Sequence, residues 1–210
     1  TEVDTHMSKN NEWGAVAYLT QSIYGRCTSS TSCTEVGINK NSSYITGYGV
    51  PAGSGTSVTN GTYDTDLGKD ASTTKTIYGI YDMSGGALEY VMGVLADSNG
   101  NPRSGNDSSY NSGFTGMLND GTTYTGVSFP DSKYYNLYTG SSYTGHALTE
   151  TKNWYSDVAS FFIPGCPWFN RGGNYNNSTS NITTAGVFYF NSGNGNSYNI
   201  ISSRLVISNK

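Results

Sequence analysis

Few side chains in this sequence are suited to catalysis, and none recurs at a spacing typical of an active site. The chain has only two histidines, His6 and His146. Asp82 and Glu89 form the best carboxylate pair for acid–base chemistry, which needs two titratable groups in one cleft. Both lie beside a run of turn residues, so we expect Asp82 to cap the turn at 83–85 instead. The sequence therefore predicts a protein that is not an enzyme.

Metal-binding patterns are also weak. A cluster of oxygen-bearing side chains would suit calcium, but its members lack the spacing of a calcium-binding loop: Asp97, Asn99, Asn101 and Asp107. We interpret this segment as a turn rich in Asn, Asp and Gly. Zinc sites need more Cys and His than the chain contains. We therefore expect no metal and no cofactor.

The three cysteines separate into a close pair and a single residue. Cys27 and Cys33 flank five small polar residues, a spacer that allows a disulfide to close in an oxidising compartment. The alternative is two free thiols at the surface. Cys166 has no neighbouring cysteine, and we expect it to be buried and inert.

Charge and hydropathy exclude several classes of partner. Charged residues make up 12% of the chain and the net charge is −4. No basic run is present to bind nucleic acid, and no apolar run is long enough to span a bilayer. The chain begins without an initiator methionine or a signal peptide, so we interpret it as a fragment whose upstream targeting segment is missing. A polar, neutral surface of this kind is typical of extracellular or cell-surface proteins.

The C-terminal part of the chain contains the sequence's most distinctive feature. Between Arg171 and Arg204 there is no charged residue or histidine, but there are eight Asn, six Ser and three Tyr. Tyr offers a large amphipathic contact surface with only two side-chain torsions to order, and Asn and Ser supply adaptable hydrogen bonds. This is the composition of an antibody combining site, and it favours a ligand-binding surface. The alternative is a set of polar surface loops without a ligand.

The clearest helix is expected over residues 10–22. Asn10 or Asn11 is suited to the N-cap, and Glu12 lies in the first turn, where the helix dipole favours an anion. Residues at helical spacing then predict one buried face: Trp13, Val16, Ala17 and Thr20. Residues 152–162 predict either a second short helix or an irregular segment anchored by aromatic side chains.

Short strands and long polar loops account for most of the remaining chain. The alternation of apolar residues predicts strands at 77–83, 87–92, 168–173, 185–190 and 204–207. Ser84, Gly85 and Gly86 predict a turn between the first two, because consecutive glycines permit positive φ. We expect a single α+β domain over residues 1–210. In it, Arg171 hydrogen-bonds backbone carbonyls, while three residues of the last strands lie in the core: Val187, Leu205 and Ile207.

Three separated segments resemble one family, the formylglycine-generating-enzyme-like domains. Residues 80–90 (IYDMSGGALEY), 171–175 (RGGNY) and 203–207 (SRLVI) are similar to that family's motifs in type and order. The resemblance implies a C-type-lectin-like fold. Ser203 stands where the family has an aromatic residue, which would enter the core. The family's enzymes carry catalytic cysteines shortly after the second segment, where this chain has residues 176–179 (NNST), so we disfavour that activity as the alternative function.

The same fold also serves in variable proteins of diversity-generating retroelements, whose last strands carry Asn-rich mutable positions. Residues 174–177, 185–191 and 194–199 are similar to that pattern. Residues 5–19 resemble pilin-like surface proteins of gut Firmicutes or their phages, so a structural pilin or adhesin module is a further alternative. The resemblance implies a ligand-binding display domain with a variable region at about 168–207.

The resemblance and the composition together give a set of predicted ligand contacts. We expect the partner to be a protein or a glycan, and the membrane to be reached only through the missing upstream segment. We expect the protein to be located at the cell surface or on a phage particle. The contacts are exposed positions between the framework strands: Tyr175, Asn177, Thr179, Asn181, Thr183, Tyr189, Asn191, Asn194, Asn196, Tyr198, Asn199 and Ile200.

Overall fold

The computed structural model of the chain describes residues 3–39, 63–66, 68–96, 100, 102, 114–117, 123–127, 130–163, 166–174 and 185–209. Its helix is α1 (Asn10–Thr20), and its strands are β1 (Val3–Met7), β2 (Cys27–Ser29), β3 (Ser32–Cys33), β4 (Leu88–Leu95), β5 (Phe114–Met117), β6 (Thr123–Val127), β7 (Asn136–Tyr138), β8 (Trp168–Gly173), β9 (Ala185–Gly193), β10 (Ile201–Ser203) and β11 (Leu205–Asn209). Single 3-10 turns lie at Gly68–Ala71, Ser132–Tyr134, Thr149–Thr151 and Trp154–Ser156. The predicted α+β class is confirmed.

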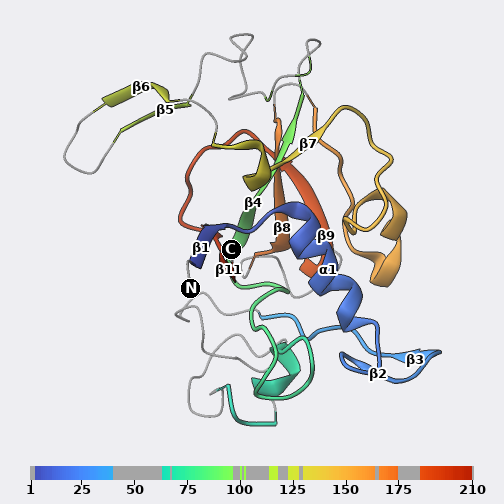
Figure 1. Cartoon of the computed structure of the whole chain (residues 1–210). Helices are drawn as coiled ribbons and strands as arrows, with labels where there is room; N and C mark the ends of the chain where they lie inside the picture. The colour runs from blue at the N-terminus through green and yellow to red at the C-terminus, as the bar shows by residue number, and fades with distance from the viewer. Residues whose placement is uncertain are drawn as a thin grey trace.

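A curled five-stranded sheet forms the centre of the molecule (Figure 1). Strand β4 pairs with antiparallel β8 on one edge, and β8 pairs with β9. The other edge of β4 is shared, because its first half pairs with β10 and its second half with β7, both in parallel. The strands predicted at 87–92, 168–173 and 185–190 are confirmed as β4, β8 and β9.

Helix α1 packs beside the sheet through the face that the sequence predicted. Trp13 and Ala17 are buried in one cluster with Val91 and Phe188, and the Trp13 indole donates a hydrogen bond to the Val187 carbonyl (2.9 Å). Apolar groups from helix and sheet therefore share a single core.

The N-cap predicted for α1 was wrong by one or two residues. Lys9 is the N-cap, and its backbone N–H donates to the Glu12 carboxylate (2.8 Å). Asn10 is instead the first helical residue, and its buried amide donates to the Tyr138 hydroxyl (2.9 Å). A tertiary contact thus uses the side chain that could have capped the helix.

The segments that carry the family resemblance lie against one another. Gly85 has a φ of 76° and donates its N–H to the carbonyl of Gly172 on β8 (2.8 Å). A Cβ on Gly85 would lie 2.1 Å from the Asn39 carbonyl oxygen, so only glycine fits. The Asp82 carboxylate accepts a hydrogen bond from the Asn39 side chain (2.7 Å). Asn39 in turn bonds the backbone of residues 84 and 86.

The two ends of the described chain lie side by side, because β1 pairs with β11 in a two-stranded antiparallel ribbon (Figure 1). The strand predicted at 204–207 is confirmed as β11, but its burial is not. Leu205 is 73% exposed and Ile207 is 72% exposed, so the prediction that they belong to the core was wrong. A two-stranded ribbon has no layer over one face, whereas Val187 in the central sheet is fully buried as predicted.

The strand predicted at 77–83 is absent: these residues lie mainly in turns and bends, with one isolated bridge between Tyr81 and Ser72. Local side-chain hydrogen bonds explain this, because the Thr74 hydroxyl accepts from the Thr76 N–H and the Thr76 hydroxyl accepts from the Tyr78 N–H. Such bonds compete with a strand ladder for the backbone.

Residues 152–162 form the irregular, aromatic-anchored segment rather than a helix. Asn153, Tyr155 and Ser156 all have positive φ, which is incompatible with a right-handed α-helix. The ring of Trp154 contacts that of Phe188 edge to face, with centroids 5.0 Å apart.

Cys27 and Cys33 form the predicted disulfide between β2 and β3. Cys166 is half-buried rather than fully buried as expected. In the part of the chain that the structure describes, no helix is long and apolar enough to cross a membrane. The disulfide is compatible with a compartment outside the cytosol.

Candidate ligand-binding groove

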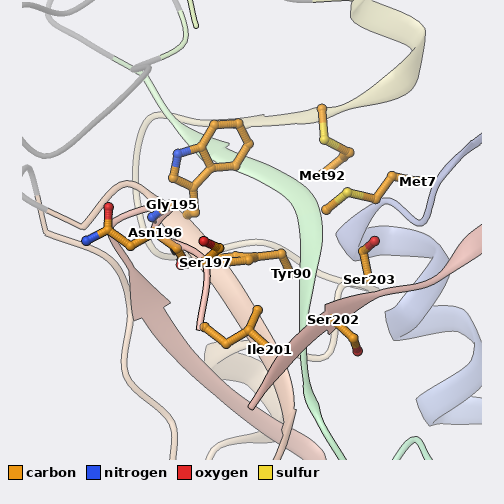
Figure 2. Close-up of a pocket in the computed structure, with 10 residues that line it drawn as sticks. Met7, Tyr90, Met92, Gly195, Asn196, Ser197, Ile201, Ser202 and Ser203 are labelled. Atoms are coloured by element: carbon orange, nitrogen blue, oxygen red, sulfur yellow. Dashed lines mark hydrogen bonds between the residues drawn. The ribbon is translucent and has the colours of Figure 1, made fainter. Parts of the chain in front are cut away.

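An open groove of about 380 Å³ lies on the face of the central sheet opposite the core (Figure 2). Side chains alternate between the two faces of a strand, so Tyr90 and Met92 point away from the core face that carries Val91. Ser203 of β10 is the register partner of Tyr90, so its side chain points to the same face of the sheet. Ile201 lies two residues before Ser203 and therefore shares this outer face. The lining consists of Met7, Tyr90, Met92, Trp168, Gly195, Asn196, Ser197, Ile201, Ser202 and Ser203.

The hydroxyl of Tyr90 fixes the loop that follows β9. It accepts a hydrogen bond from the Gly195 N–H (3.1 Å) and donates one to the Asn196 carbonyl (3.3 Å). Partial burial raises the pKa of Tyr90, so the phenol stays protonated at neutral pH and remains a donor. The loop over residues 194–200, here called the rim loop, is therefore attached to the groove by its backbone.

Two local features shape the rim loop. The Asn194 side chain accepts from the Asn196 N–H (3.1 Å), which closes a tight turn. Gly195 within that turn has a φ of 85°, and a Cβ there would lie 3.2 Å from the Trp168 indole nitrogen. The close approach of the loop to Trp168 thus depends on glycine.

The end of the rim loop joins the sheet through backbone bonds. Leu88 donates its N–H to the Ile200 carbonyl (2.8 Å), and the Ile201 N–H donates to the Tyr198 carbonyl (3.0 Å). None of these bonds depends on the side chain at position 198 or 200. Positions 198 and 200 can therefore vary in sequence while this junction keeps its backbone path.

A partly buried ion pair lies beneath this junction. Arg204 contacts both oxygens of the Glu89 carboxylate, from Nε at 3.0 Å and from Nη2 at 2.5 Å, and also donates to the Tyr81 carbonyl (3.0 Å). Burial raises the pKa of Glu89, and the Arg204 guanidinium opposes that shift. Glu89 and Asp82 thus both have structural partners, Arg204 and Asn39.

Arg171 supports the sheet from the core side. It is fully buried on β8 and donates to the Ala147 carbonyl (2.9 Å), as the framework role predicted. Its guanidinium lies over the rings of Trp13 and Phe190, at 5.6 and 5.7 Å from their centroids. Burial lowers the pKa of Arg171 to about 9.

The predicted contact residues fall into three groups. Asn194, Asn196, Tyr198, Asn199 and Ile200 form the rim loop: Asn196 lines the groove, residues 196, 198 and 199 are exposed, and Ile200 is half-buried. A second group lies on β9. A third group lies outside the described residues: Tyr175, Asn177, Thr179, Asn181 and Thr183. The four oxygen-bearing residues that would suit calcium also lie outside them: Asp97, Asn99, Asn101 and Asp107.

The β9 group differs from the prediction. Tyr189 is only 6% exposed, so it offers almost no surface to a ligand. The side chain of Tyr189 points to the face of β9 opposite the one that carries Phe188 and Phe190, as alternation predicts. Both faces of β9 are covered at this point, so all three side chains are buried. Asn191 is half-buried, and its amide donates to the Tyr189 hydroxyl (3.4 Å).

Sequence reasoning missed the floor of the groove. Met7, Met92 and Trp168 lie on three strands far apart in the sequence. Only Met92 had a usable signal, because the alternation over residues 87–92 places it on the face opposite Val91. Ser203, which stands where the resembling family has an aromatic residue, does not enter the core. It is exposed and lines the groove.

Among the described residues, no group of three or more His, Cys, Asp or Glu side chains is arranged to hold a metal ion. None of the described residues that line the groove is charged. Comparison with known proteins adds no assignment, since no protein-family model and no curated protein sequence matches this chain.

Proposed function

We propose that this chain is the ligand-binding domain of a surface protein diversified by a retroelement, with a C-type-lectin-like fold of the formylglycine-generating-enzyme-like subclass. One observation carries the proposal: the uncharged rim loop borders an apolar groove and is attached mainly through backbone bonds, two of them to the hydroxyl of Tyr90. A binding site built in this way accepts new side chains without losing its shape.

The packing of the framework supports the proposal. The resembling segments meet at the bond between Gly85 and Gly172 and at the ion pair between Glu89 and Arg204. Three distant segments that contact one another belong to one structural unit, as a shared fold requires. The proposed role is ligand binding rather than catalysis, at the cell surface or on a phage particle.

The proposal is tested by changing the rim loop alone. Asn196, Tyr198 and Asn199 are replaced together by serine, and the domain is screened against an array of neutral oligosaccharides and a library of displayed proteins. We expect the variant to keep the parent melting temperature within a few degrees and to lose or exchange its ligands. Unchanged ligands would contradict the proposal.

A second test uses the gene's surroundings. Diversification requires a reverse transcriptase gene and a near-copy of the C-terminal coding segment that differs at template adenines. If the neighbouring DNA contains neither, the retroelement part of the proposal is wrong.

A further inference from the structure

Strand β10 has one open edge beside the groove. It is the last strand in the sheet order, and no strand of the described part of the chain pairs with its outer side. In a parallel pair, alternate residues direct their backbone groups toward the same neighbour. The Ile200 carbonyl faces β4, where it accepts from Leu88, so residue 202 faces β4 and Ser203 faces outward. Ser203 is also an exposed residue.

The groove beside this edge suits one apolar side chain. Its volume of about 380 Å³ is near the small end of the roughly 300–1,000 Å³ typical of ligand pockets. Met7 and Met92 are flexible and polarisable, so they adapt to ligands of different shape.

The same lining is poorly suited to a sugar. Trp168 is only 7% exposed and offers little ring face for stacking. The Tyr90 hydroxyl is already used by the rim loop. The described lining residues include no carboxylate or cation to hold sugar hydroxyls.

We propose that the ligand is a protein whose extended segment adds as a strand to the outer edge of β10 and inserts an apolar side chain into the groove. This inference rests on the proposed function and specifies the class of ligand. Strand addition supplies affinity through main-chain hydrogen bonds, and a side-chain pocket supplies selectivity. Ser203 provides the main-chain groups, and Met7 and Met92 contact the inserted side chain.

The test uses a phage-displayed library of random linear peptides as the probe, with an array of neutral oligosaccharides in parallel. Ser203→Pro removes the outward N–H without touching the groups that pair with β4, and Ser203→Ala is its matched control. We expect the proline variant to bind selected peptides about five- to tenfold more weakly, the effect of one lost hydrogen bond. The alanine variant should bind within about twofold of the parent.

A second pair of variants tests the inserted side chain. Met92→Gln keeps the length of the side chain but makes it polar, whereas Met92→Leu keeps it apolar. We expect the glutamine variant to lose about tenfold in affinity and the leucine variant to stay within about threefold. Methylation of the peptide's own main-chain nitrogens tests the same strand pairing with the protein unaltered, and it should also weaken binding.

The outcomes separate this inference from the proposed function. Selected peptides that share an apolar residue and respond to both variant pairs support the inference. If no peptide is selected, or if peptide binding ignores Ser203→Pro, Met92→Gln and N-methylation, the inference is wrong. Oligosaccharide binding that is lost in the triple serine variant of the rim loop but kept by Ser203→Pro would overturn the inference and leave the proposed function in place.

Discussion

Replacement of Tyr90 by phenylalanine tests the link between the framework and the rim loop. The change keeps the ring in the wall of the groove and removes only the hydroxyl, which bonds Gly195 at 3.1 Å and Asn196 at 3.3 Å. A typical hydrogen bond contributes about 0.5–1.5 kcal/mol net. The residues at the loop are exposed, so water replaces part of the loss, and we expect the free energy of unfolding to fall by about 1 kcal/mol.

The local effect should be clearer than the global one. The Gly195 N–H loses its acceptor, and we expect its hydrogen exchange to accelerate about tenfold, as a change of about 1.4 kcal/mol in local opening implies. Ligand affinity should fall by a similar factor or less, because the binding-competent loop conformation becomes less populated. The assay is native-state hydrogen exchange followed residue by residue.

Tyr81→Phe is the matched control. Its hydroxyl also donates to loop carbonyls, those of Tyr63 (2.8 Å) and Thr76 (3.3 Å), but these lie outside the groove. This variant should leave Gly195 exchange and ligand affinity unchanged. The reasoning would be refuted if Tyr90→Phe left Gly195 exchange unaltered, or if it accelerated exchange equally across β8 and β9.

Three further changes probe the framework. Burial and the carboxylate of Glu35 raise the pKa of Asp157 to about 8, and burial raises that of Glu35 to about 7. The two carboxyl groups interact, so the folded pair retains one shared proton that the unfolded chain releases. The free energy of unfolding should fall as pH rises from about 4 to about 8, by at most about 1.4 kcal/mol per pH unit for one shared proton. Asp157→Asn should flatten this pH dependence when both proteins are unfolded in denaturant at several pH values, and an equal slope in both proteins would contradict the prediction. Arg204→Met leaves the Glu89 carboxylate buried without its cation and should cost about 3 kcal/mol or more, while adding Glu89→Met should recover part of the loss in chemical denaturation. Gly195→Ala forces a side chain to positive φ against the groove wall, and we expect about 1 kcal/mol of destabilisation with weaker ligand binding; tighter binding would show that the glycine is dispensable.

The sequence alone determined the features that depend on local periodicity and composition. Helical spacing gave the buried face of α1, and alternation gave β4, β8 and β9. The short, polar spacer between Cys27 and Cys33 gave the disulfide. The uncharged composition of residues 172–203 marked the rim loop. These features arise from neighbouring residues, so they can be recognised without knowing the fold.

Only the tertiary structure decided which positions face a ligand. Tyr189 and Tyr198 have the same chemistry, but covered faces of β9 bury the first, while the loop beyond Gly195 exposes the second. Leu205 and Ile207 alternate like core residues, yet they lie on a two-stranded ribbon without a covering layer.

The groove is the clearest case of this dependence. Its walls come from β1, β4, β8 and β10, whose sequence positions extend from Met7 to Ser203. No local pattern relates residues so far apart, because their proximity follows from strand pairing. The sequence therefore specified the chemistry of the rim, and the sheet topology specified the floor.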